Sequence, residues 1–234
     1  MGRFEEYLTH FETAYPELNF IEKERDIIIE GRIRIIDSVG EEWDNFDIKI
    51  IIPSNYPKKL PIVFETSDKL EKKIGNHFFE NESCCLGWWS ELHLKLQGNY
   101  SFSNFIEKVV IPFFKQQVYK DYNEGKFVNE LTKHNVLDGL TFYMNLFETD
   151  KWRIALLGLG QASTRRKAND LCFCFKIKNK KCRSHEDKVM ALRKYCGKDL
   201  LRNDFMIILE ELIKTNKITN TDPVVIELKK RKYI

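Results

Sequence analysis

Tyr56-Pro57-Lys58-Lys59-Leu60-Pro61 is a proline-framed turn between two stretches that have the pattern of β-strands. Before it, apolar residues alternate with polar ones and occupy one face, at Phe46, Ile48, Ile50 and Ile52. After it comes the short apolar segment 62–65. Strict alternation is typical of a strand with one buried face, and proline ends a strand because it cannot donate a ladder hydrogen bond. We therefore expect two strands that are joined through this turn.

Upstream, the segment 26–37 has the same period of two, and Val39-Gly40-Glu41-Glu42 supplies a turn before the next strand. Together these segments predict an antiparallel meander with one buried face. An amphipathic helix is expected before it, from Arg3 to Ala14.

Downstream, the pattern is lost between Ser67 and Tyr100, and loops of this length inside a domain are usually functional. Ser103 is then the expected N-cap of a helix that Pro112 should kink or interrupt. Further helices are expected at 137–148, 152–160, 186–196 and 200–214.

The charge is divided unevenly along the 234 residues, although the net charge is only +3. Residues 1–150 have 17 Lys and Arg against 26 Asp and Glu, whereas residues 151–234 have 21 against 9. We expect a domain at 1–150 and a helical, basic region at 151–234. The basic region is open to an acidic partner, or else the two halves attract each other and pack.

The composition excludes several classes of protein. A hydrophobic content of 43% with 31% charged residues is typical of an ordinary globular protein. The N-terminus lacks the apolar core of a signal peptide, and no apolar run approaches the ~20 residues of a membrane span. Six cysteines without a secretion signal predict a reducing cytoplasm, where thiols serve metals or catalysis, and no membrane association.

Cys84 and Cys85 lie in the long loop, between the polar turn Glu80-Asn81-Glu82-Ser83 and Leu86-Gly87. A cysteine is a nucleophile where it is partly exposed and its thiolate is favoured. In the alternative interpretation both thiols are buried as small hydrophobic side chains.

Over residues 3–120 the sequence resembles the ubiquitin-conjugating enzymes. The resemblance runs through the N-terminal helix, the strands that end at Pro53, the Tyr56-Pro57 turn, His77 and Cys85-Leu86. It implies an α+β fold in which Cys85 carries ubiquitin or a ubiquitin-like modifier as a thioester. The modifier would come from an activating enzyme, which uses the ATP, and would pass to an amine on a target protein. Cys84 would be an alternate or resolving thiol.

The His-Pro-Asn tripeptide of that family is absent, and Asn76-His77-Phe78 stands near its place. Asn76 and His77 are therefore the candidate catalytic helpers, with Asn81 and His93 as alternatives. The resemblance is closest to the bacterial branch, through Tyr122-Asn123-Glu124-Gly125 and residues 130–134. Members of that branch accompany anti-phage defence operons, which implies a defence role. The alternative is a non-catalytic module that binds a ubiquitin-like protein or a defence protein.

A second group of thiols predicts a metal site. Three cysteines and one histidine lie within fourteen residues, at Cys172, Cys174, Cys182 and His185. Such a set completes a closed, tetrahedral, structural zinc site. The segment, with Asn169-Asp170 before it, resembles the SEC-C zinc motif, although the glycine-rich turn of that motif is replaced. The alternative is a decayed motif with unliganded thiols. No organic cofactor is expected.

The basic residues around the second group of thiols suggest a partner. Arg165, Arg166 and Lys167 precede a run of lysines at 176, 178, 180 and 181, with Phe173 and Phe175 between them. Nucleic acid would be bound through phosphate contacts from such a surface. We favour an acidic protein partner over nucleic acid, and a solvated basic face remains the plainest interpretation.

Overall fold

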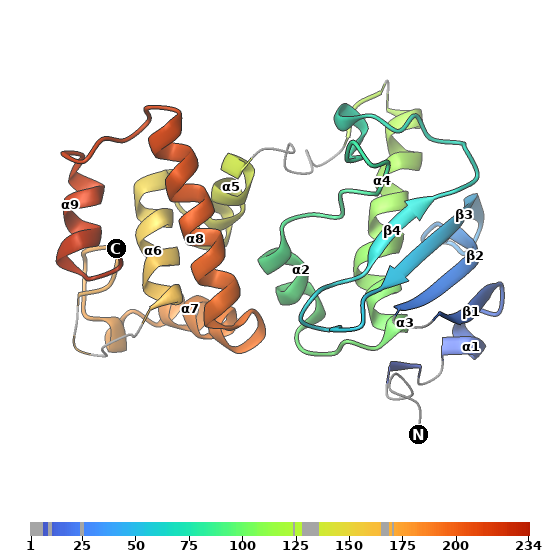
Figure 1. The fold of residues 1–234 in the computed structure, drawn as a ribbon, viewed down its shortest axis with the longest axis horizontal. Coiled ribbons are helices and arrows are strands. Elements are labelled where there is room, and N and C mark those ends of the chain that lie inside the picture. Colours follow the sequence, from blue (N-terminus) through green and yellow to red (C-terminus); the bar gives the residue numbers. More distant parts are fainter. Residues whose placement is uncertain are drawn as a thin grey trace. The chain divides into compact units, whose positions relative to one another are not determined.

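The computed structural model describes residues 7–8, 11–23, 26–123, 125–127, 136–164, 169 and 171–234. The chain forms two compact units, Met1–Lys133 and His134–Ile234, and each is described here by itself (Figure 1). The division falls earlier than the expected boundary at residue 150. The helix predicted at 137–148 belongs to the second unit, where it packs on two helices of that unit.

Unit 1 is built on a four-stranded antiparallel sheet. Its strands are β1 (Leu18–Lys23), β2 (Asp26–Ile36), β3 (Glu42–Ile52) and β4 (Ile62–Glu65). They pair in the order β1-β2-β3-β4, so every strand lies beside its neighbour in sequence (Figure 1). The predicted meander of β2, β3 and β4 is therefore confirmed, and β1 is an additional edge strand that the sequence pattern did not predict. The Tyr56–Pro57 peptide bond in the turn before β4 is cis.

The alternation of isoleucines determines which face of the sheet is buried. Ile29 pairs with Ile50, and Ile33 pairs with Phe46. Each of these side chains is at most 2% exposed. Polar residues of the two strands point to the opposite, outer face, where Arg32 of β2 forms an ion pair with Asp47 of β3. Because strand side chains alternate between faces, the apolar sets of β2 and β3 fall on the same side and form the core.

The helices of unit 1 cover this core. They are α1 (Phe11–Ala14), the 3₁₀ turn η2 (Ile74–Asn76), α2 (Trp89–Leu96), α3 (Phe102–Phe105), the π-helical segment η3 (Ile106–Val110) and α4 (Ile111–Tyr122). Helix α4 packs on β2. It also contacts β3, because the ring centroids of Phe114 in α4 and Phe46 in β3 are 4.7 Å apart. The expected helix from Arg3 is described only in part, because residues 1–6 and 9–10 lie outside the described residues.

One detail of the helix after the loop differs from expectation. The N-cap is Ser101, whose hydroxyl accepts a hydrogen bond from the Asn104 backbone, rather than Ser103. The regular α-helix is interrupted near Pro112, as the sequence predicts. The π-helical segment η3 comes directly before α4, and Pro112 lies in the first turn of α4. A proline has no N–H to donate to the preceding turn, and a wider π-turn before it lets the helix continue.

Unit 2 is helical in its described part. Its helices are α5 (Val136–Leu146), α6 (Trp152–Ser163), the 3₁₀ turn η4 (Asn179–Lys181), α7 (Arg183–Tyr195), α8 (Gly197–Lys214) and α9 (Pro223–Lys230). Helix α6 packs against α5, α7, α8 and α9. Gly158 and Gly160 of α6 permit this close approach, since a Cβ on Gly158 would lie 2.6 Å from the Phe147 ring.

The two units together make a mixed α+β chain, as the sequence predicts. Across the stretches that the structure describes, no helix is both long enough and apolar enough to cross a membrane.

Candidate thiol loop and candidate metal centre

The thiol loop returns alongside strand β4. Ser83 forms an antiparallel bridge with Phe64, and the Cys84 backbone N–H donates to the Val63 carbonyl at 2.7 Å. Phe78 and Cys84 form a second bridge, which closes the loop into a narrow hairpin. The Cys85 backbone N–H then donates to the His77 carbonyl at 2.8 Å. The backbone at both cysteines is therefore held in place by hydrogen bonds.

The two neighbouring thiols lie in different environments. Cys84 is 4% exposed and belongs to the hydrophobic core, whereas Cys85 is partly exposed. Successive side chains of an extended segment point to opposite sides, so one cysteine faces inward and the next faces outward. Burial raises the pKa of the Cys84 thiol far above its ordinary value. Such a thiol stays protonated and inert, which argues against Cys84 as an alternate nucleophile.

Asn76 and His77 form the turn beside the thiol loop. Asn76 ends η2, and His77 follows it in the left-handed conformation with φ 62°. The His77 side chain is buried, and its ring meets the Phe127 ring edge-on at a centroid distance of 4.7 Å. The His77 carbonyl accepts the backbone hydrogen bond from Cys85.

The Asn76 side chain is engaged at both ends. Its amide Nδ2 donates to the Glu71 carbonyl at 2.9 Å, and its Oδ1 accepts a hydrogen bond from the Lys120 ammonium. Gln117 Nε2 donates to the Asn76 carbonyl at 2.9 Å. These contacts favour a structural role for Asn76, and its catalytic role stays a prediction. Lys120 and Gln117 were not among the expected site residues, because they follow more than 40 residues later on α4 and no sequence pattern connects them to Asn76.

The alternative helpers also have structural partners. His93 is buried in α2, and its Nδ1 lies 2.8 Å from the Tyr100 hydroxyl. Burial lowers the pKa of His93 below its ordinary value. Asn81 Oδ1 accepts hydrogen bonds from the Ser83 backbone and hydroxyl at 3.2 and 2.7 Å. Each residue therefore stabilises local structure in unit 1.

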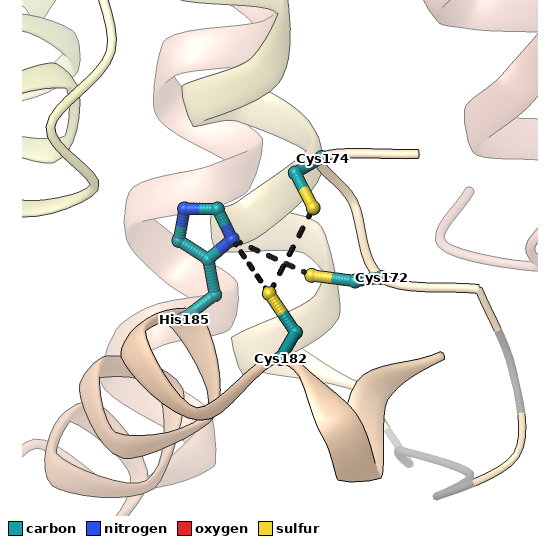
Figure 2. A group of neighbouring side chains, drawn as sticks. All are labelled: Cys172, Cys174, Cys182 and His185. Carbon is teal, nitrogen blue, oxygen red and sulfur yellow. Dashed lines mark hydrogen bonds between the residues drawn. The ribbon is translucent and has the colours of Figure 1, made fainter. Parts of the chain in front are cut away.

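The structure brings together all four expected metal ligands of unit 2. Figure 2 shows the side chains of Cys172, Cys174, Cys182 and His185 converging on one point. Their ligand atoms all lie within 4.8 Å of one another, so the cluster could hold a metal ion. Cys172 and Cys174 come from a turn after α6, and His185 comes from the first turn of α7. Cys182 immediately precedes that helix. Asp170, which precedes the turn in sequence, lies outside the described residues.

Hydrogen bonds and packing fix the turn that carries the first two cysteines. The Cys172 N–H donates to the Ile177 carbonyl, and the Phe175 N–H donates to the Cys172 carbonyl, both at 2.9 Å. Between the cysteines, Phe173 is fully buried, and its ring lies 4.8 Å from Phe147 and 4.6 Å from His185 between centroids. Phe173 therefore anchors the cluster to the core of unit 2.

The protonation of the cluster suits metal binding. Burial lowers the pKa of His185, and Lys188 lowers it further, which favours the neutral imidazole that metals require. Burial raises the pKa of the Cys172 thiol to about 12. Burial also acts to raise the pKa of Cys174, but the Lys176 backbone N–H and the neighbouring thiols outweigh it, so the net shift is downward. A metal ion would displace the protons that remain on the other thiols.

No protein-family model, curated protein or solved structure matches this chain. The functional interpretation therefore depends on the residues and contacts described above.

Proposed function

We propose that unit 1 is a thioester carrier of the ubiquitin-conjugating type, with Cys85 as the nucleophile. One observation supports this most strongly. The loop beside β4 turns one thiol of an adjacent pair into the core and leaves the next one, Cys85, partly exposed. The order of elements, a four-stranded meander followed by a thiol loop and then a long helix, agrees with the resemblance that predicted it.

The proposed reaction has two steps. The Cys85 thiolate attacks the thioester carbonyl of a modifier held on the activating enzyme, and that enzyme's cysteine leaves as a thiolate. An amine of the target then attacks the Cys85 thioester and forms an amide, and the Cys85 thiol is regenerated. The hydrogen bond from the Cys85 N–H to His77 holds the nucleophile's backbone during both steps. The proposed setting is a bacterial cytoplasm, in a defence operon.

The rival function is a binding module without catalysis. It is favoured by Asn76, whose side-chain amide is held by Glu71 and Lys120 and so is not poised to stabilise an oxyanion. Loss of one oxyanion donor typically slows turnover by about a hundred- to thousandfold. The proposed enzyme would therefore be slow unless another donor replaces it.

One experiment separates the two functions. The protein is mixed with ATP, a ubiquitin-like modifier and the matching activating enzyme, and the products are run on a gel without reductant. The carrier forms an adduct that a thiol reductant removes. Cys85→Ser should give a more stable oxyester or no adduct, and Cys84→Ser, as the matched control, should still be loaded. Binding of the modifier without any adduct in the wild type would establish the rival function.

We also propose that the cluster in unit 2 holds a structural zinc ion. Zinc with Zn–S bonds of about 2.3 Å and Zn–N bonds of about 2.05 Å in a tetrahedron would separate its ligand atoms by about 3.8 Å (S to S) and 3.6 Å (S to N). The Cys174 and Cys182 sulfurs are 3.8 Å apart, and the Cys172 and Cys182 sulfurs lie 3.6 and 3.3 Å from His185 Nδ1, so these distances are close to those of such a site. Four protein ligands leave no open position for a substrate, which supports a structural role.

A further inference from the structure

The turn of the metal cluster exposes three large apolar side chains. Leu171, Phe175 and Ile177 are 43%, 44% and 43% exposed, although the seven-residue stretch that holds them also contains the fully buried Phe173. We call these three side chains the apolar tip. Leu171 bridges to Lys178 and the Ile177 carbonyl bonds to Cys172, so the tip rests on a short hairpin fixed by backbone hydrogen bonds. A surface that is held in shape in this way can bind a partner without first becoming ordered.

Phe175 is held in an unfavourable backbone conformation. Its φ is +61°, in the left-handed region that glycine enters freely and a bulky aromatic residue rarely adopts. Strained residues of this kind cluster at binding and active sites. The exposed ring therefore calls for an explanation other than the fold of the turn.

The neighbouring helix α9 supports the apolar tip. Arg231, just after α9, donates through Nη1 to the Leu171 carbonyl at 2.8 Å. Its guanidinium carbon lies 5.0 Å from the centroid of the Phe175 ring, in a cation–π contact. Arg231 is itself bonded to Glu227 at 2.6 Å. A second segment of unit 2 thus holds the tip in place.

The two segments that form and support the apolar tip are rich in lysine, and we call their exposed lysines the lysine rim. Lys176, Lys178 and Lys181 are exposed on the hairpin side, and Lys229 and Lys230 are exposed in the last turn of α9. Residues 171–182 contain no Asp or Glu. Among the described residues, Glu227 is the carboxylate that contacts this region, and its pairing with Arg231 offsets little of the lysine charge. An apolar centre with a rim of one charge sign fits a partner with the opposite charge.

We propose that the apolar tip and its lysine rim form a docking surface for an acidic protein segment that carries apolar side chains. Leu171 and Ile177 are aliphatic, and an aliphatic side chain receives a partner's Leu or Phe but gives no stacking platform for a base. In addition, the Arg231 guanidinium already lies over the Phe175 ring, so that face of the ring is not free to stack on a base. The chemistry of the tip therefore favours a peptide over a nucleic acid. This surface does not involve Cys85, so it stands independently of the thioester function.

The test measures binding of labelled probes to the whole, metal-loaded protein by fluorescence anisotropy. One probe is a fluorescein-labelled peptide that repeats Glu-Glu-Leu-Phe. A second peptide repeats Glu-Glu-Ser-Ser, and a third probe is oligo-deoxythymidine. We expect the first peptide to bind most tightly, and we expect its affinity to fall as salt is added. The second peptide measures how much of the binding comes from negative charge alone, and the third probe measures binding of a nucleic acid.

Two variants localise the binding. Phe175→Gly removes the aromatic ring and also relieves the left-handed strain, so the metal should stay bound while the peptide affinity falls by about tenfold or more. Lys176→Glu with Lys178→Glu should weaken it at least as much. Lys214→Glu with Lys217→Glu makes the same charge change at the last residue of α8 and in the turn after it, where both lysines are exposed, and should have a much smaller effect. Metal content and circular dichroism confirm that each variant is folded.

Three outcomes would overturn the proposal. The first is that the Glu-Glu-Leu-Phe peptide does not bind. The second is that it binds equally well to the tip variants and to the control variant, which would indicate attraction by net charge alone. The third is that oligo-deoxythymidine binds more tightly and loses affinity in Phe175→Gly, which would assign the surface to nucleic acid.

Discussion

At the scale of single residues, the thiol pair is the most informative feature of unit 1. The two cysteines are adjacent in sequence, yet one lies in the core and the other is partly exposed. The sequence identifies such a pair. Which thiol faces outward depends on how the loop that carries the thiols pairs with β4, and the sequence does not show this pairing. That register is set by the bridge from Ser83 to Phe64, a contact between segments that have no shared pattern.

This difference predicts selective alkylation. Iodoacetamide should modify Cys85 at least about tenfold faster than Cys84, because only the partly exposed thiol can reach the reagent as a thiolate. Peptide mass spectrometry over a time course measures both rates in one sample. In denaturant, where burial is lost, the two rates should become similar. Equal rates in the native protein would contradict the placement of Cys84 in the core.

A second prediction at this scale concerns Gly158. A helical Gly→Ala change ordinarily stabilises by about 1 kcal/mol, but here the added Cβ would meet Phe147 ring atoms at 2.6 to 3.0 Å. Phe147 is 1% exposed and has little room to move. We expect Gly158→Ala to lower the free energy of unfolding of unit 2 by about 1–3 kcal/mol, measured in urea. Gly75→Ala, where no atom lies within 4 Å of the added Cβ, should be close to neutral in unit 1.

At the scale of elements, the sequence predicts the strands better than the ends of the helices. Isoleucine alternation determined both the extent and the buried face of β2 and β3. The N-cap was misplaced because Ser101 and Ser103 are equally good caps, and only the backbone at Asn104 distinguishes them. Helix α9 was not predicted, although Asp222-Pro223 is a recognisable start signal for a helix.

Asp222 connects the start of α9 to α6. Its carboxylate accepts the Val224 N–H at 2.9 Å as the N-cap of α9, and it pairs with Arg153 of α6 at 2.9 Å. Asp222→Ala should destabilise unit 2 by about 1–2 kcal/mol, since it removes the cap and the ion pair together. Asp222→Asn keeps a capping oxygen and removes only the charge, so it should cost less. Chemical denaturation of the two variants side by side measures this difference.

The same residue gives a pH dependence with a definite sign. The hydrogen bond from Arg153 lowers the pKa of Asp222 below its ordinary value. A carboxyl whose pKa is lower in the folded state stabilises that state fully above its ordinary pKa, about 3.9, and loses this contribution as the pH falls through the folded value. Wild-type unit 2 should therefore lose stability below about pH 4 more steeply than Asp222→Asn does. Parallel slopes would contradict this role.

At the scale of the whole molecule, the two units should respond differently to loss of the metal. Each has its own buried core, so each can unfold in its own transition. The four ligands hold together the turn at residues 171–178 and the start of α7. A strong chelator should lower the melting temperature of unit 2 and leave that of unit 1 unchanged, as measured by differential scanning calorimetry.

Two cysteine variants provide the control for this prediction. Cys174→Ser should reproduce the effect of the chelator and abolish metal binding. Cys196→Ser should do neither, because Cys196 follows α7 and is not part of the cluster. Full metal content in Cys174→Ser, or a chelator effect on both transitions, would show that the four residues do not form the metal site.

The sequence predicted the four residues of the candidate metal centre as a set because all four lie within fourteen residues, so local spacing alone carries the information. The surroundings of the thiol loop were less predictable. Asn76 is held by Gln117 and Lys120, which approach only when α4 packs against the sheet, and no short motif encodes such a contact.

The simple strand order of unit 1 has a consequence for how the protein is made. Each strand pairs with the strand just synthesised, so no part of the sheet has to wait for a distant segment of chain. Pairings between near neighbours cost little loop entropy and form quickly. During translation, unit 1 can therefore fold while unit 2 is still being synthesised, and the strand edges of unit 1 are available to other nascent chains only briefly.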